Sequence, residues 1–249
     1  EFMSTPYNEE DVDFLMGLDV PALKLASIHA AEPSFLSYAA RTMKPLVIST
    51  GMCTMLEVKR AVEIVRGAGN ENCVLLQCTT NYPSPAKDAN LRAMVTMRDQ
   101  LDVPVGYSDH TQTDTSCVAA VALGACVIEK HLTLDKAMPG PDHSSSFSPG
   151  EMKTFVAKIR EAETVLGNAV KVPSELEARN AAGMRRGITA RRNIAKGARI
   201  APEDLILKRP LSAMPASAWD MVVGTIATRD IPAGTHLGPG DFTLLGSRV

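Results

Sequence analysis

Two histidines follow short apolar runs near the middle of the chain. His110 lies in "VGYSDHT" and His131 lies in "VIEKHLT". Side chains alternate along a strand, so Ser108 and His110 share one face, and Glu129 and His131 share one face of the next strand. If the strands are neighbours, their axes lie about 4.8 Å apart, and both imidazoles could bind one metal ion. Two protein ligands leave positions open for water and substrate, as catalysis requires. The alternative is that each histidine only hydrogen-bonds a carbonyl group.

Two other apolar runs carry polar side chains of possible chemical use. Lys24 lies within "PALKLAS", and a lysine is seldom buried without a partner, which here could be a phosphate. Ser27 ends the same run and could add a hydroxyl group. Tyr82 follows a third run in "QCTTNYPSP" and could pack against a ligand or hydrogen-bond it. The alternatives are a surface lysine on an edge strand and a rigid turn around the tyrosine.

The elements that must position these side chains are short apolar runs. Each is four to seven residues long and largely apolar on both faces, which favours strands of a covered parallel sheet. The predicted strands are residues 1–5, 22–27, 45–50, 74–79, 103–108 and 125–131.

Helical patterns separate and follow these runs. Thr54 with Glu57 and Ser148 with Glu151 have the spacing of a capping box, and Pro149 takes the first helical position after Ser148. The predicted helices are residues 9–17, 33–42, 54–69, 90–100, 114–123 and 148–167. Six successive β/α units predict an α/β fold, either an open doubly wound sheet or a (β/α)8 barrel. The first strand is not followed by G-x-G-x-x-G, which disfavours nucleotide binding.

The last third of the chain has a different organisation. Residues 168–185 are polar and lack strong periodicity, so we interpret them as a linker between a domain at 1–167 and one at 186–249. "ARRNIAKGARIAPEDL" (190–205) then matches "ATRDIPAGTHLGPGDF" (227–242) at an offset of 37 residues. Two copies are too few for a solenoid and predict a small pseudo-twofold β-rich module.

Composition restricts the class of protein. The 249 residues are 45% hydrophobic and 22% charged with a net charge of −2, which argues against nucleic-acid or membrane-surface binding. No apolar run reaches the length of a membrane span, and the first residues lack the pattern of a signal peptide. The five cysteines include no C-x-x-C pair. They are interpreted as reduced core thiols of a cytoplasmic protein.

The motifs resemble those of the N-acetylneuraminate (sialic acid) synthase family, with its C-terminal antifreeze-like (SAF) domain. The resemblance runs from about residue 2 to the C-terminus, through "CTTNYPSP", "VPVGYSDHT", "VALGACVIEKHLTLDKAMPGPDH", "LILKRP" and the repeat. Members join phosphoenolpyruvate to a six-carbon amino sugar and release phosphate by C–O cleavage. The resemblance implies a (β/α)8 TIM-type barrel, incomplete here with about six of eight units.

The resemblance also assigns roles to residues of this sequence. It implies that His110 and His131 hold a divalent metal, usually Mn2+, with Mg2+ or Co2+ possible. It also implies that the substrates are contacted by Lys24, Ser27, Tyr82 and Ser108, and that Asp142 binds the sugar. Lys24 is expected to have a catalytic role as well. Arg209 in "LKRP" is expected to reach the sugar site of the other protomer in a domain-swapped homodimer.

Three departures from the family pattern bear on these roles. The family has two further β/α units, with an acidic residue and a lysine, ahead of the first residue here, so we expect a truncated chain. Ile28 and His29 stand where the family usually has a glutamate that touches the sugar, and Leu211 replaces a glycine after "KRP". The alternatives are a related phosphoenolpyruvate synthase or metal-dependent aldolase acting on a sugar phosphate, a non-catalytic carbohydrate- or ice-binding protein, and a fragment that misfolds.

Overall fold

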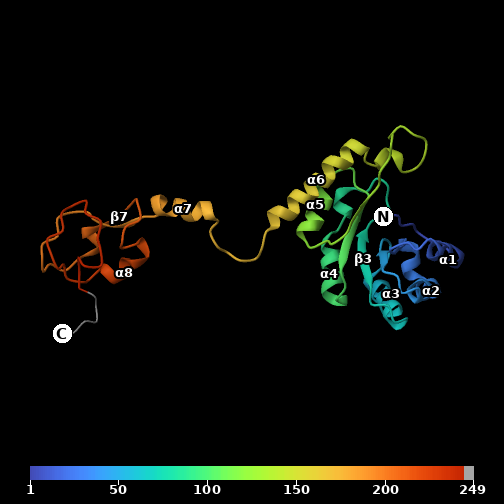
Figure 1. Ribbon diagram of the computed structural model, residues 1–249, viewed down its shortest axis with the longest axis horizontal. Coiled ribbons are helices and arrows are strands. Elements are labelled where there is room, and N and C mark those ends of the chain that lie inside the picture. Colours follow the sequence, from blue (N-terminus) through green and yellow to red (C-terminus); the bar gives the residue numbers. More distant parts are fainter. Residues whose placement is uncertain (244–249) are drawn as a thin grey trace. The chain divides into compact units, whose positions relative to one another are not determined.

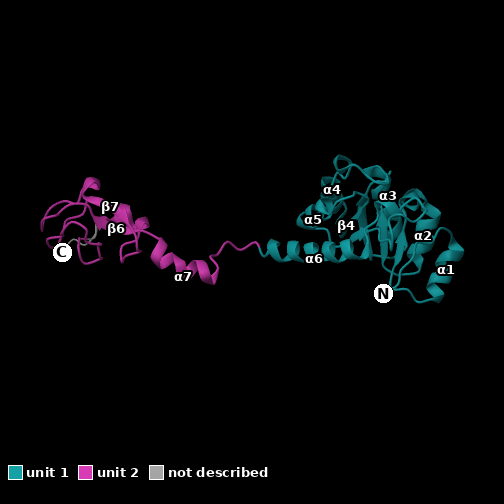
Figure 2. Ribbon diagram, turned by 90° about the horizontal axis from the view of Figure 1, so that it is seen from above, with its two compact units in different colours: residues 1–168 teal, residues 169–249 magenta. Residues whose placement is uncertain are grey.

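The computed structural model describes residues 1–243, so residues 244–249 of the expected C-terminal domain lie outside the described residues. The chain divides into two compact units, residues 1–168 and 169–249, each with a separate hydrophobic core (Figure 2). Among the described residues, no helix has the length and apolar character needed to cross a bilayer.

Unit 1 is a parallel sheet flanked by helices (Figure 1). Its strands are β1 (Leu23–Leu25), β2 (Leu46–Ser49), β3 (Cys73–Cys78), β4 (Val105–Asp109) and β5 (Ile128–Lys130). Its helices are α1 (Glu9–Gly17), α2 (Pro33–Arg41), α3 (Met55–Gly67), α4 (Arg92–Leu101), α5 (Thr115–Ala122) and α6 (Pro149–Leu166). Short 3-10 helices occupy Ser27–Ala31, Ala86–Asp88 and His143–Ser145.

The strand order decides between the two α/β architectures that the sequence left open. The five strands pair in parallel in the order β1-β2-β3-β4-β5, without the reversal of strand order that defines a doubly wound sheet. This arrangement is an incomplete TIM-type barrel, as predicted. The central strands are almost wholly buried, because Leu46, Ile48, Leu75 and Tyr107 each have 0% exposure.

The predicted sixth strand at residues 1–5 is wrong. Within residues 1–243, the backbone hydrogen bond that joins this segment to the sheet runs from Lys24 N to Ser4 O, at 3.4 Å. Pro6 follows at once and has no N–H group, so the pairing cannot continue past Thr5. Edge strand β1 is only three residues long, so it has few backbone groups with which a further strand could pair.

The capping boxes predicted for α3 and α6 are both present, with Thr54 and Ser148 as the capping residues. The five cysteines are free, as expected, and Cys73, Cys78 and Cys117 are buried. The expectation that all of them are core thiols is wrong for Cys126, which is exposed because it precedes edge strand β5.

Unit 2 contains helix α7 (Glu175–Met184), the antiparallel pair β6 (Gly187–Ala190) and β7 (Leu205–Lys208), and helix α8 (Trp219–Val222). Short 3-10 helices occupy Pro202–Asp204 and Ala216–Ala218. Helix α7 lies in the segment interpreted as a linker, and Ser174 and Glu177 form a capping box at its start.

The internal repeat is a structural pseudo-twofold. Asn193 accepts a hydrogen bond from Ala233 N, and Asp230, 37 residues after Asn193, accepts one from Lys196 N. Ile194 bridges Ile231, its counterpart at the same offset. In a second pair of matched contacts, Arg192 binds Asp204 and Arg229 binds Asp241. The contacts of Asn193, Asp230 and the two isoleucines therefore join the two copies reciprocally.

Candidate active site at the carboxyl ends of the strands

A cleft of about 400 Å³ opens where the parallel strands of unit 1 end. It is lined by seven of the eight residues singled out from the sequence: Lys24, Ser27, Tyr82, Ser108, His110, His131 and Asp142. These residues lie up to 118 positions apart in the chain, from 24 to 142, and the parallel sheet brings them together. The carboxyl ends of such strands are where barrel enzymes carry their active sites.

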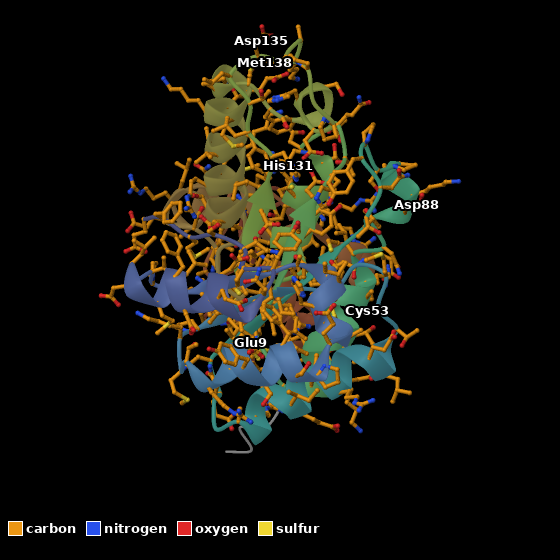
Figure 3. The ribbon with its side chains drawn as sticks, turned by 90° about the vertical axis from the view of Figure 1, so that its right-hand side faces the viewer. Glu9, Cys53, Asp88, His131, Asp135 and Met138 are labelled. Atoms are coloured by element: carbon orange, nitrogen blue, oxygen red, sulfur yellow. The ribbon has the colours of Figure 1, made fainter. Side chains whose placement is uncertain are left out.

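The two histidines project from the ends of adjacent strands. β4 pairs with β5 in a register that sets Ser108 beside Glu129 and Asp109 beside Lys130, so His110 and His131 follow at the same level. Their ring centroids are 5.1 Å apart, with the planes at 66°. The prediction that the two strands are adjacent is therefore confirmed. Figure 3 shows His131 over the strand ends, with Asp135 and Met138 on a loop that extends beyond it.

The surroundings keep His110 neutral. Burial lowers its pKa below the usual value, and the adjacent imidazole of His131 lowers it further. A neutral imidazole is the form that binds metal ions. The Nδ1 atom of His110 is buried and has no hydrogen-bond partner among the described residues. A buried nitrogen without a partner is unusual, and it disfavours the alternative in which the His110 ring only hydrogen-bonds a carbonyl group. It fits a ring whose ligand is absent.

The two neighbouring imidazoles thus fit the chemistry of the divalent ion that the resemblance implies, and they would be its protein ligands. No cluster of three or more His, Cys, Asp or Glu side chains with metal-binding geometry occurs in residues 1–243. The remaining coordination positions would be left to water and substrate, as in open catalytic sites.

Tyr82 and Asp142 complete the histidine side of the cleft. The ring centroid of Tyr82 lies 4.1 Å from that of His110 and 5.7 Å from that of His131. Burial raises the pKa of Tyr82, so its hydroxyl remains protonated and can donate a hydrogen bond. An Asp142 carboxylate oxygen is 3.8 Å from Nδ1 of His131, so Asp142 faces the histidine pair.

A cation lies on the opposite side of the cleft. The Lys24 side chain is only 13% exposed although β1 is an edge strand, so the surface-lysine alternative is wrong. Its Nζ atom donates to Ser49 Oγ at 2.7 Å and lies 3.7 Å from a Glu129 carboxylate oxygen. The Ser27 hydroxyl accepts a hydrogen bond from the Gly51 N–H group at 2.9 Å. These groups place the ammonium group of Lys24 among serine hydroxyls, with the Glu129 carboxylate beside it, and the ammonium group is the charge on this side that can bind an anion.

Glu129 is the residue whose importance the sequence reasoning missed. It accepts a hydrogen bond from Ser108 Oγ at 2.6 Å and contacts Lys24, so it joins the cation side of the cleft to the histidine side. The signal available in the sequence is the spacing of Glu129 and His131, which puts both side chains on one face of a strand. Arg209, the eighth residue, belongs to unit 2, where it is exposed and directly follows β7.

One of the departures noted from the sequence, at Ile28 and His29, can also be located. The Ile28 side chain lines the cleft, with 46% of the residue exposed. His29 turns away into the core, at 2% exposure, and bonds Glu32 through Nδ1 at 2.7 Å. The cleft wall next to Ser27 is therefore apolar.

The incomplete TIM-type barrel, with a histidine pair in a cleft at its strand ends, places the chain among α/β proteins built like barrel enzymes. Within that class the chain belongs to the NeuB family, whose model matches residues 1–171, and a SAF domain matches residues 185–243.

The chain is 46% identical to the N,N'-diacetyllegionaminic acid synthase of Legionella pneumophila, over 95% of this chain and 68% of that protein. It is 36% identical to a pseudaminic acid synthase of Campylobacter jejuni, over 96% of this chain and 69% of that protein. Among solved structures, the N-acetylneuraminic acid (sialic acid) synthetase of Leptospira borgpetersenii is similar, with a TM-score of 0.67 and 31% identity. That match covers 71% of this chain and 61% of the Leptospira chain. The chain is therefore homologous to nonulosonic acid synthases and spans about two thirds of their length.

Proposed function

We propose that this chain carries the active site of a nonulosonic acid synthase that condenses phosphoenolpyruvate with an open-chain amino sugar. The observation that carries the proposal is the meeting of a partly buried lysine, a histidine pair and a bridging glutamate in one cleft. The cleft has an ammonium group on one side and two adjacent imidazoles on the other. An anionic substrate and a carbonyl substrate can therefore lie side by side.

The anionic side would hold phosphoenolpyruvate. Lys24 supplies the positive charge for the phosphate, and the Ser27 hydroxyl can donate a hydrogen bond to it or to the carboxylate. Ser108 would contact the substrate while its own hydroxyl donates to Glu129. Glu129 orients both Lys24 and Ser108 through the contacts described above. Holding the methylene carbon against the aldehyde carbon lowers the entropic part of the barrier.

The histidine side would hold the sugar. His110 and His131 would bind a divalent ion, most suitably Mn2+, which when bound supplies Lewis acidity to the aldehyde oxygen. The carboxylate of Asp142 would accept hydrogen bonds from sugar hydroxyls, and the Tyr82 ring would pack beside the substrates. The methylene carbon of phosphoenolpyruvate bonds to the aldehyde carbon, water adds to the enol carbon, and phosphate leaves with the bridging oxygen.

The substrate we favour is a sugar with two acetamido groups, as in the diacetyllegionaminic acid of the 46% identical relative. The apolar wall at Ile28 suits such a sugar, because each acetamido group carries a methyl group that can be buried there. We further propose that Arg209 acts from unit 2 on the sugar of a partner protomer in a domain-swapped homodimer, and that the protein works in the cytoplasm.

Phosphate release tests the function directly. The chain is incubated with Mn2+, phosphoenolpyruvate labelled with 18O at the bridging oxygen, and a diacetamido, a monoacetamido or a 6-phosphorylated amino sugar. We expect sugar-dependent release of labelled phosphate, fastest with the diacetamido sugar. Release of unlabelled phosphate would indicate a phosphatase and contradict the proposal. Sugar binding without any release would favour the carbohydrate-binding alternative, and preference for the phosphorylated sugar would favour the sugar-phosphate synthase.

A further inference from the structure

Each of the two cleft histidines directly follows a buried charged residue. Asp109 precedes His110 at the end of β4, and Lys130 precedes His131 at the end of β5. The register of the parallel pair sets Asp109 opposite Lys130, and Lys130 Nζ lies 2.7 Å from Asp109 Oδ2. The two side chains are only 2% and 0% exposed, so water does not weaken this ion pair.

The pair is held from all sides. Asp109 accepts hydrogen bonds from Tyr107 OH at 3.0 Å, Ser116 Oγ at 3.1 Å and Thr111 N at 2.9 Å. Lys130 Nζ also donates to the Thr111 carbonyl and lies 4.5 Å from the centroid of the Phe147 ring. Burial alone would raise the pKa of Asp109, but the bonds from Lys130 and Thr111 outweigh it and hold that pKa below its usual value. These contacts hold the side chains of Asp109 and Lys130 in fixed positions.

The geometry relates this pair to the histidines through the backbone. Alternation turns Asp109 and Lys130 to the face of the sheet opposite the cleft, while His110 and His131 face into it. Lys130 binds the residues on both sides of His110, namely the carboxylate of Asp109 and the carbonyl of Thr111. One ammonium group thus ties the backbone around His110 to the residue directly before His131.

We propose that Asp109 and Lys130 are positioning residues that fix the distance between the two imidazoles and thereby set the affinity of the site for a divalent ion. This inference rests on the proposed metal site. Stability alone explains the pair poorly, because a buried ion pair is often no more stabilising than apolar side chains of similar volume. Its position, one residue before each histidine, is what a positioning role requires.

Substitutions at the two positions distinguish an effect of imidazole spacing on Mn2+ affinity from an effect of the charge left behind. Lys130→Met leaves a buried negative charge near the ion, and charge alone would then tighten Mn2+ binding. Asp109→Asn leaves a buried positive charge, and charge alone would weaken it. If the pair sets the spacing, both variants bind Mn2+ more weakly, by roughly 10- to 100-fold, which is the usual cost of losing groups that orient metal ligands.

The measurement is titration of the full chain with Mn2+ alone, following the electron paramagnetic resonance signal of the free ion. Lys44→Met is the matched control, since Lys44 forms a 2.7 Å ion pair with Asp19 and lies outside the cleft lining. We expect Lys44→Met to retain wild-type affinity. Circular dichroism establishes that each variant is folded. Ser116→Ala removes a single donor to Asp109 and serves as a milder variant if Lys130→Met does not fold, with a loss of affinity in the same direction but smaller.

The outcomes distinguish the two proposals. A wild-type chain that binds no Mn2+ would overturn the metal site and the inference with it. A wild-type chain that binds Mn2+, together with a folded Lys130→Met variant of equal or higher affinity, would overturn the positioning role alone. If only Ser116→Ala is folded, unchanged affinity in that variant has the same meaning.

Discussion

At the scale of single residues, the histidine pair is the most direct target. His110→Ala and His131→Ala each remove one of the two proposed protein ligands, so we expect each to lower the rate of phosphate release by at least about 100-fold, the upper end of the losses known for outer-sphere changes. His236→Ala is the control, because His236 lies in unit 2 and bonds Thr189 there. Full activity in both cleft variants would contradict the metal assignment.

Lys24 tests the other half of the cleft. Lys24→Met removes the charge proposed to hold phosphoenolpyruvate while keeping most of the side-chain volume. A hydrogen bond to a charged group contributes roughly 1.5–3 kcal/mol. We therefore expect a rise of about 10- to 100-fold in KM for phosphoenolpyruvate, with little change in KM for the sugar. Steady-state kinetics with each substrate varied in turn would measure both values, and an equal rise in both would argue against a phosphate-binding role.

Residue types and strand ends were enough to predict most of this cleft. Lys24, His110 and His131 each end or interrupt an apolar run, which is a signal visible in sequence. The partnership of Asp109 with Lys130 was not visible, because it depends on the register of β4 against β5, and a shift of one residue would separate the two charges. The bridging position of Glu129 depends on the same register.

At the scale of elements, Gly106 in β4 makes a close approach that no other residue permits. A Cβ atom at Gly106 would lie 2.4 Å from the Val127 carbonyl oxygen and 2.6 Å from a methyl carbon of Leu76. Gly106→Ala must therefore push β4 away from its neighbours, at a cost of about 1–3 kcal/mol or more. Urea unfolding measures the loss. Gly67→Ala is the matched control, since nothing lies within 4 Å of its added Cβ, and we expect it to be neutral or stabilising.

The start of α6 makes a pH prediction. Hydrogen bonds from Lys136 and from the Ser148 backbone and hydroxyl lower the pKa of Glu151 to about 2. A carboxyl whose pKa is lower in the folded state stabilises the fold above its unfolded pKa of about 4.3, and this contribution is lost as pH falls toward 2. We expect the difference in Tm between wild type and Glu151→Gln to shrink across that range. A difference that stays constant from pH 6 to pH 2 would contradict it.

The helices also show what sequence could and could not predict. Thr54 and Ser148 start helices with a polar side chain followed three residues later by glutamate, and both capping boxes form. Ser174 and Glu177 carry the same signal within the segment interpreted as a linker, where weak apolar periodicity hid it. The predicted strand at residues 1–5 failed for the opposite reason, because apolar character alone cannot supply a hydrogen-bonding neighbour.

At the scale of the whole molecule, two separate cores predict two unfolding transitions. Ile231 in unit 2 and Leu75 in unit 1 are 1% and 0% exposed and belong to different hydrophobic clusters. Truncating either to alanine should cost about 2–5 kcal/mol. We expect calorimetry to show Ile231→Ala lowering one transition and Leu75→Ala lowering the other. A single transition shifted equally by both variants would show that the units unfold together.

The two halves of unit 2 repeat the same contacts at positions 37 residues apart. Asn193 and Asp230 perform the same task in opposite directions between the halves, and the ion pairs of Arg192 and Arg229 repeat one contact within each half. An ancestral duplication with later divergence would leave this record: interlocking side chains kept in both halves while exposed positions drift apart. Mutational scanning of the two halves should accordingly yield tolerance profiles that superimpose when one is shifted along the sequence, except where one half has acquired a task of its own.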